Sequence, residues 1–140
     1  MPPSRELHCV IVTPEKALFD EAADFVAVPM FDGELGVLPG RMPLIGRLGC
    51  GELRLRRGME VHRFFVDSGF VQVKANTITV LTARAQRAEE IDTEVVAQSL
   101  QAALAPATTP QGTEERLKVQ ESARAQLRVA RHREESAVRG

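Results

Sequence analysis

The chain has 140 residues, of which 44% are hydrophobic and 26% are charged, which fits one domain or one domain with a small appendage. Lysine and arginine total 18 against 19 acidic residues, and this balance excludes the strongly basic character of nucleic-acid-binding and membrane-surface proteins. No apolar run approaches the roughly 18 residues of a transmembrane helix. The first residues resemble neither a signal peptide nor a transit peptide, so we expect a soluble, cytoplasmic chain.

The composition changes sharply along the chain. All six phenylalanines lie between Phe19 and Phe70, and seven of the ten glycines lie between Gly33 and Gly58. The residues after about position 88 are instead rich in alanine, glutamine, glutamate and arginine. We therefore predict two units, residues 1–88 and residues 89–140.

The first unit reads as strands and turns. Leu7–Val12 is a short apolar run, and Phe25–Met30 is a second one whose Pro29 predicts an edge strand or a bulge. In the segment Glu52–Arg56 charged residues alternate with leucines, which predicts a strand with its leucines turned inward. The glycines between these runs recur too often for a helix.

The clearest single element is a hairpin over residues 69–81. Valine and isoleucine alternate with polar residues on both sides of Ala75–Asn76, which supplies the turn. A further strand is expected at Val61–Val66. Many short strands at this spacing predict an antiparallel β-sandwich or barrel.

The second unit reads as two helices. Asp92 or Thr93 caps the first, and the segment 105–112 (APATTPQG) breaks the chain before a second helix that opens at Thr113. The apolar positions expected to pack are Val96, Leu100 and Leu104 in the first helix and Val119, Ala123, Leu127 and Ala130 in the second. Such a pair forms an antiparallel hairpin too small for a core of its own, so it should lean on the sandwich or on a partner.

The second helix carries a concentrated positive charge. Between Arg116 and Arg133 there are six basic residues and one acidic residue, Glu121. Arg124, Arg128 and Arg131 recur at the spacing of one helix face, about 100° from the alanine and leucine positions. Two main interpretations stay open, a solvated helix face and a docking face for an acidic protein surface. Nucleic acid is the weakest alternative, because no aromatic residues are interleaved for base stacking.

Groups for catalysis are scarce. His8 and Cys9 would point to opposite faces of a strand, and no paired metal-binding or nucleophile motif occurs, so we expect neither a metal site nor an enzyme. With only Cys9 and Cys50, a disulfide framework is not expected, and both are predicted to be reduced, buried thiols.

One segment identifies a family. The run VPMFDGELGVLPGRMPLIGRLGCGELRL, residues 28–55, resembles the ε subunit of F-type ATP synthases, whose pattern is "GELGILPGHAPL" followed by "GELRI". The segment TPEKALFDEAADFVAVP from Thr13 and the segment DSGFVQVKANTITVLTARAQRAEEID also match that family. The segment ESARAQLRVARHR resembles its second C-terminal helix, so the likeness covers about residues 7–133.

The resemblance implies a non-catalytic rotor subunit at the cytoplasmic face of the bacterial inner membrane. Such a subunit binds the γ subunit, seats it on the c-ring and couples proton flow to ATP synthesis elsewhere. The loop Gly33–Pro43 would face the c-ring, with Glu34 and Arg41 as polar contacts and with Gly36, Pro39 and Gly40 shaping the loop.

The resemblance also implies that residues 89–140 form a mobile arm. Packed on the sandwich, the arm is inactive, whereas extended it reaches the catalytic β and α subunits and inhibits ATP hydrolysis. We predict that Arg124, Arg128 and Arg131 then face an acidic segment of a catalytic subunit.

The chain departs from the family pattern at three places. Arg41 replaces a histidine, and the usual double glycine near residue 69 is reduced to Gly69 alone. Of a motif through which some bacterial members bind ATP, Ile91 and Asp92 are present, whereas Val95 and Val96 replace its arginine and alanine. We therefore expect no cofactor. A stand-alone nucleotide-sensing module is the alternative function, and an unrecognised small enzyme is a distant third.

Overall fold

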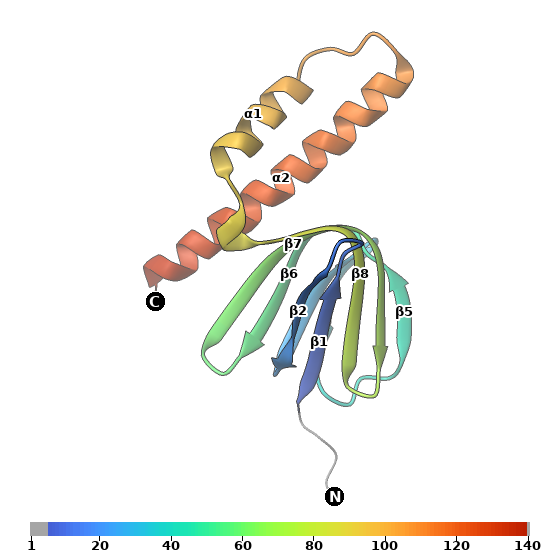
Figure 1. Ribbon diagram of the computed structural model, residues 1–140, viewed down its shortest axis with the longest axis vertical. Helices are drawn as coiled ribbons and strands as arrows, with labels where there is room; N and C mark the ends of the chain where they lie inside the picture. The colour runs from blue at the N-terminus through green and yellow to red at the C-terminus, as the bar shows by residue number, and fades with distance from the viewer. Residues whose placement is uncertain (1–5, 140) are drawn as a thin grey trace, which may run out of the picture.

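The computed structural model describes residues 6–139, and the side chains of residues 6–135 (Figure 1). An eight-stranded sheet folds on itself round one core, and two helices follow at one end of it, as predicted. The strands are β1 (Leu7–Val12), β2 (Ala17–Ala23), β3 (Phe25–Met30), β4 (Gly33–Val37), β5 (Leu44–Arg47), β6 (Cys50–Arg57), β7 (Glu60–Lys74) and β8 (Thr77–Arg87). The helical elements are the 3-10 turn η1 (Ala88–Glu90), α1 (Thr93–Ala103) and α2 (Pro110–Arg139). We call α1 and α2 the arm.

The strand order is β2-β1-β8-β7-β6-β3-β4, with β5 paired to β7. The described pairs are antiparallel except β1 with β8, which run parallel. The parallel pair of β1 and β8 was not predicted, since an antiparallel pattern was expected throughout. It is possible because a long stretch of chain separates the two strands, enough to return in the same direction.

The long hairpin of β7 and β8 joins the two halves of the sandwich. The prediction of separate strands at 61–66 and 69–74 was wrong, because β7 is one strand that turns at Ser68 (φ +66°) and Gly69 (φ +121°). The predicted turn is confirmed, since Ala75 and Asn76 both adopt positive φ angles between the strands.

The alternation in β6 is confirmed, because Leu53 and Leu55 are fully buried in the core. Pro29, however, does not mark an edge strand. Strand β3 lies between β6 and β4, and its pairing with β6 covers only Phe25–Ala27, so Pro29 lies beyond that ladder. The missing N–H of proline therefore breaks no bond of the β3–β6 ladder.

The helices differ from the prediction mainly at their ends. Helix α1 ends at Ala103, so Leu104 follows the helix and is 48% exposed. Helix α2 begins at Pro110 and not at Thr113, because the Thr109 hydroxyl accepts a hydrogen bond from the Gly112 amide (2.9 Å). Proline suits a first helical position because the amide it lacks would have no partner there.

Candidate functional site

The arm meets the sandwich through a small apolar cluster, which we call the junction cluster. It is separate from the sandwich core and consists mainly of alanine and valine side chains around one phenylalanine. Its buried members are Phe65, Ala88, Ile91, Val96, Ala123, Ala125, Val129 and Ala130, with Cys50, Leu100 and Leu127 packed against them. Because the two clusters are separate, the arm can leave without opening the sandwich core.

Three pairs of polar side chains join α2 to the sandwich. Arg84 of β8 donates a hydrogen bond to the Ser122 hydroxyl (3.3 Å), and the Gln126 amide donates to the side-chain carbonyl of Gln86. Near the end of the helix, the carboxylate of Glu52 in β6 accepts from Nδ1 of His132 (2.8 Å). Sequence reasoning missed these pairs, although the polar positions Ser122 and Gln126 interrupt a run of alanines at helical spacing.

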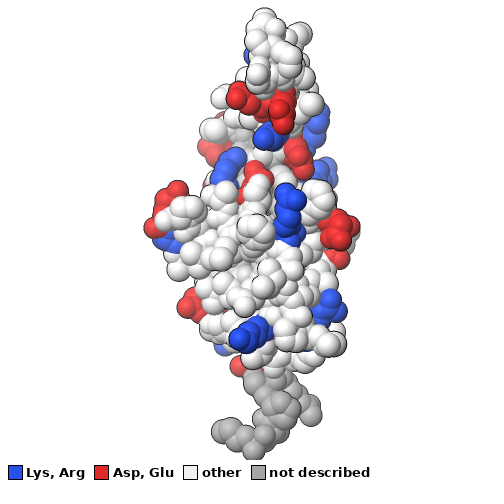
Figure 2. All heavy atoms as spheres, turned by 90° about the vertical axis from the view of Figure 1, so that its right-hand side faces the viewer, with Lys and Arg blue, Asp and Glu red and all other residues white. Residues whose placement is uncertain are grey.

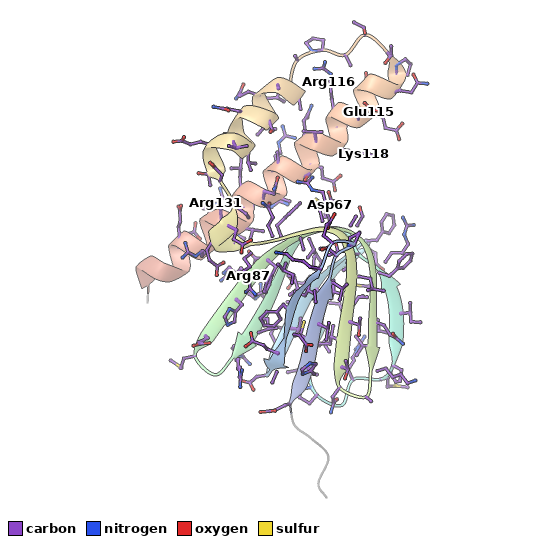
Figure 3. All side chains as sticks on the ribbon, in the orientation of Figure 1. Asp67, Arg87, Glu115, Arg116, Lys118 and Arg131 are labelled. Carbon is purple, nitrogen blue, oxygen red and sulfur yellow. The ribbon has the colours of Figure 1, made fainter. Side chains whose placement is uncertain are left out.

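A different face of α2 holds α1. The Arg116 guanidinium donates to the carbonyl oxygens of Ala102 (3.2 Å) and Ala105 (2.7 Å) at the end of α1 (Figure 3). Gln120 donates to the carbonyl of Ala103 (2.9 Å). These side chains satisfy carbonyl groups that the helix end would leave unpaired.

The predicted basic residues occupy a third face of α2, which we call the basic face. Arg124, Arg128 and Arg131 are exposed, and they lie between about 180° and 240° on the helix when Ser122 is set at 0° and each residue advances about 100°. Arg131 lies 4.0 Å from Glu135, whereas Arg124 and Arg128 form no ion pair with the described side chains. The basic face therefore stays open while the arm is packed on the sandwich.

The predicted apolar positions of α2 are buried only in part. Ala123 and Ala130 are buried and Leu127 is half-buried, as expected, whereas Val119 is 44% exposed. Val119 lies beside the end of α1, in a shallow hollow that Ala102 and Ala103 also line. The fully buried positions that the prediction omitted are Ala125 and Val129, which belong to the face toward the sandwich.

The residues predicted to form one c-ring-facing loop are divided between a strand and a loop. Glu34 and Gly36 lie in β4, and the Glu34 carboxylate lies 3.5 Å from the Arg54 guanidinium of β6. Pro39, Gly40 and Arg41 follow the strand, at the end of the sandwich far from the arm (Figure 1). The Gly40 amide, in a residue with φ +86°, donates to the side chain of Asn76 (2.8 Å), which ties this loop to the β7–β8 turn.

One outward face of the sheet is apolar. Phe70 pairs with Arg47 on one side and with Leu81 on the other, and both Phe70 and Leu81 are about half exposed. The Arg47 guanidinium lies 4.9 Å from the ring centre of exposed Phe31. Figure 2, viewed from the β5 side, shows charged side chains gathered along the arm and few at the centre of the sandwich. An aromatic and arginine surface of this kind is typical of protein interfaces.

Both cysteines are free thiols, but their surroundings differ. Cys9 is fully buried in the sandwich core, and burial raises its pKa to about 12. Cys50 is half-buried and packs against the junction cluster where α2 crosses the sandwich. Its pKa is also raised to about 12, first by burial and then by the negative charges of Asp67 and Glu121.

The remnant of the ATP motif has a structural role. Ile91 is buried in the junction cluster, and the Asp92 carboxylate accepts hydrogen bonds from the amides of Glu94 (3.1 Å) and Val95 (3.2 Å). Asp92 is therefore the N-cap of α1, as the sequence indicated.

We expect Asp92→Ala to destabilise α1 by about 1 kcal/mol, because two helix amides lose their acceptor. Faster hydrogen exchange at the Glu94 and Val95 amides would report this loss. Asp92→Asn keeps an acceptor oxygen and is the control. Equal exchange rates in the alanine variant and the parent would contradict the assignment.

Comparison with known proteins decides the family. Residues 6–88 match the family described as ATP synthase, Delta/Epsilon chain, beta-sandwich domain. The chain belongs to the ATP synthase epsilon family. An epsilon chain of Rhodopirellula baltica is 47% identical over 126 residues, which span 89% of this chain and 98% of that relative. An epsilon chain of Desulforamulus reducens is 48% identical over 84 residues, or 60% of this chain and 64% of that relative.

Solved structures share the fold of this epsilon-family chain. A chain from the Euglena gracilis mitochondrial ATP synthase, in a structure of OSCP, F1 and c-ring, superposes with a TM-score of 0.75 at 24% identity. The match covers 91% of this chain and 84% of that one. A chain from the central stalk and c-ring of the Tetrahymena thermophila enzyme gives a TM-score of 0.68 at 16% identity, covering 93% and 99%.

An epsilon chain is a non-catalytic subunit of the ATP synthase, in agreement with the prediction. Within residues 6–139, neither helix combines the length and the apolar character needed to span a bilayer.

Proposed function

We propose that this chain is a rotor subunit of the central stalk of an F-type ATP synthase. In that role it binds the γ subunit, seats it on the c-ring and couples proton transport to ATP synthesis at the catalytic subunits. The chain then lies at the cytoplasmic face of the bacterial plasma membrane, and the other subunits of the complex hold it there. The family assignment and the apolar sheet face around Phe70 support binding to another stalk subunit.

We further propose that the loop of Pro39, Gly40 and Arg41 contacts the c-ring. Arg41 and the neighbouring Met42 are exposed, and the hydrogen bond from Gly40 to Asn76 holds the loop in place. Glu34 contributes from the start of β4, at most about 23 Å along the chain from Arg41 at strand spacing.

The arm is proposed to inhibit ATP hydrolysis when it is extended. The observation that carries this proposal is the separation of the junction cluster from the sandwich core. An arm held mainly by alanine and valine side chains loses little burial on release, so both positions are accessible. In the extended position the basic face is proposed to contact an acidic segment of the catalytic β and α subunits.

We expect ATP hydrolysis to rise about tenfold when Arg124, Arg128 and Arg131 are all replaced by alanine. Exposed ion pairs contribute about 0.5 kcal/mol each, so loss of three weakens the inhibitory contact by about 1.5 kcal/mol. The measurement is the hydrolysis rate of the assembled complex. The triple lysine variant keeps the charge and should stay inhibited. An unchanged rate in the alanine variant would rule out this role for the basic face.

A further inference from the structure

The inhibitory function proposed above requires contacts that set the equilibrium between the packed and the extended position of the arm. The apolar part of the contact is weak and unspecific, because alanine side chains fit many positions along a helix. The polar part is specific, because each pair demands one partner at one place. The position of α2 on the sandwich is therefore decided by its polar side chains.

These polar side chains form a line along the sandwich-facing side of α2. Ser122 and Gln126 are one turn apart and both are buried, although they are polar. Their partners Arg84 and Gln86 are alternate residues of β8, so both point to the same side of the strand. Two successive turns of helix thus meet two successive outward positions of one strand.

The third contact lies at the other end of the junction. Glu52 is mostly buried, and the Arg63 guanidinium holds its Oε1 atom (2.7 Å) while Oε2 meets His132. A carboxylate only accepts, so Nδ1 of His132 carries the hydrogen. Because Arg63 belongs to β7, Glu52 is oriented from the sandwich side whether or not the arm is present.

We propose that these three pairs, Ser122–Arg84, Gln126–Gln86 and His132–Glu52, form a polar latch that holds the arm on the sandwich. The latch uses α2 alone, and α1 is carried by the separate face that contains Arg116 and Gln120. Removal of the latch shifts the arm toward release while the sandwich and the α1–α2 pair stay folded. This inference rests on the function proposed above.

The two cysteines report separately on release of the arm and on opening of the sandwich. Cys50 packs against the junction cluster under α2, so it becomes more accessible and more reactive when the arm leaves, since release removes burial, the largest cause of the raised pKa of its thiol. Cys9 is fully buried in the sandwich, so it becomes reactive only when the sandwich itself opens. Iodoacetamide labelling followed by peptide mass spectrometry distinguishes the two sites.

The test variant is the full chain with Ser122→Ala, Gln126→Ala and His132→Ala. We expect the labelling rate of Cys50 to rise about tenfold through loss of three hydrogen bonds, with no change at Cys9. Gln86→Ala removes the sandwich partner of Gln126 and should raise the labelling rate of Cys50 by a smaller factor, again with no change at Cys9. A control with Gln98→Ala and Ser99→Ala alters similar, exposed residues of α1 and should change neither thiol.

An unchanged Cys50 rate in the triple variant would overturn the latch. Equal acceleration of Cys9 and Cys50 would overturn it as well, because the variant would then unfold the sandwich rather than release the arm. In the assembled complex, a released arm should lower ATP hydrolysis, opposite to the effect of removing the basic face. Faster Cys50 labelling without that decrease would support the latch and contradict the inhibitory function.

Discussion

Replacing Gly69 with alanine is expected to lower the free energy of unfolding by about 4 kcal/mol. A Cβ atom at this position would lie 1.9 Å from the Leu81 carbonyl oxygen and 2.9 Å from the Thr82 Cα, and backbone atoms of a central strand cannot move aside. The φ angle of +121° adds strain for any residue with a side chain. Overpacking and backbone strain cost roughly 2 kcal/mol each. Thermal or urea unfolding of the full chain measures the loss.

Gly58 is the matched control for this variant. It also has a positive φ angle (+61°), but a Cβ atom there would meet nothing within 4 Å. Gly58→Ala should therefore cost only about 1 kcal/mol, the strain alone. Similar losses at Gly58 and Gly69 would show that the contact with Leu81 is relieved by a shift of the hairpin.

Ser68 gives the converse expectation. It adopts φ +66°, a left-handed conformation that favours glycine, so Ser68→Gly would relieve strain in the backbone. The expected gain is about 1 kcal/mol in the same unfolding experiment.

The second large effect is expected from Val129→Asp. Val129 is fully buried in the junction cluster, and an aspartate there would place an unpaired carboxylate among alanine and phenylalanine side chains. Releasing the arm avoids this desolvation, so a shift of at least about 3 kcal/mol, or roughly a hundredfold, toward the released arm is expected. Small-angle scattering should record a larger radius of gyration, with the sandwich still folded.

Val119→Asp on the same helix is the control. Val119 is exposed, so the same charge there should leave the radius of gyration unchanged. An equal increase of the radius of gyration in both variants would show that added negative charge on α2 releases the arm. The burial of Val129 would then not be the reason.

The elements with strong local patterns could be predicted from the sequence. The alternation in β6, the turn at Ala75–Asn76 and the Asp92 cap are each set by neighbouring residues, and each is confirmed. The short strands β2, β4 and β5 were not predicted. These strands of four to seven residues carry little alternation, and they are strands because β1, β3 and β7 offer them partners.

The arrangement of α2 was predictable only in part. Helical spacing separates the basic face from the alanine positions, and the structure agrees. Spacing alone, however, does not reveal that α2 has two buried faces, one for α1 and one for the sandwich. Ser122, Gln126 and His132 look like solvent-facing residues until their partners, which lie about 40 to 80 positions earlier, are placed beside them.

The central claim is that this chain is a subunit of the stalk. The most direct measurement is co-expression of the full chain with the γ, α and β subunits of the same ATP synthase, followed by purification through a tag on γ. We expect the chain to co-purify in equal amount with γ, and the Val129→Asp variant to do so as well, because its sandwich is intact. Loss of the parent chain from a complex that retains γ, α and β would contradict the account.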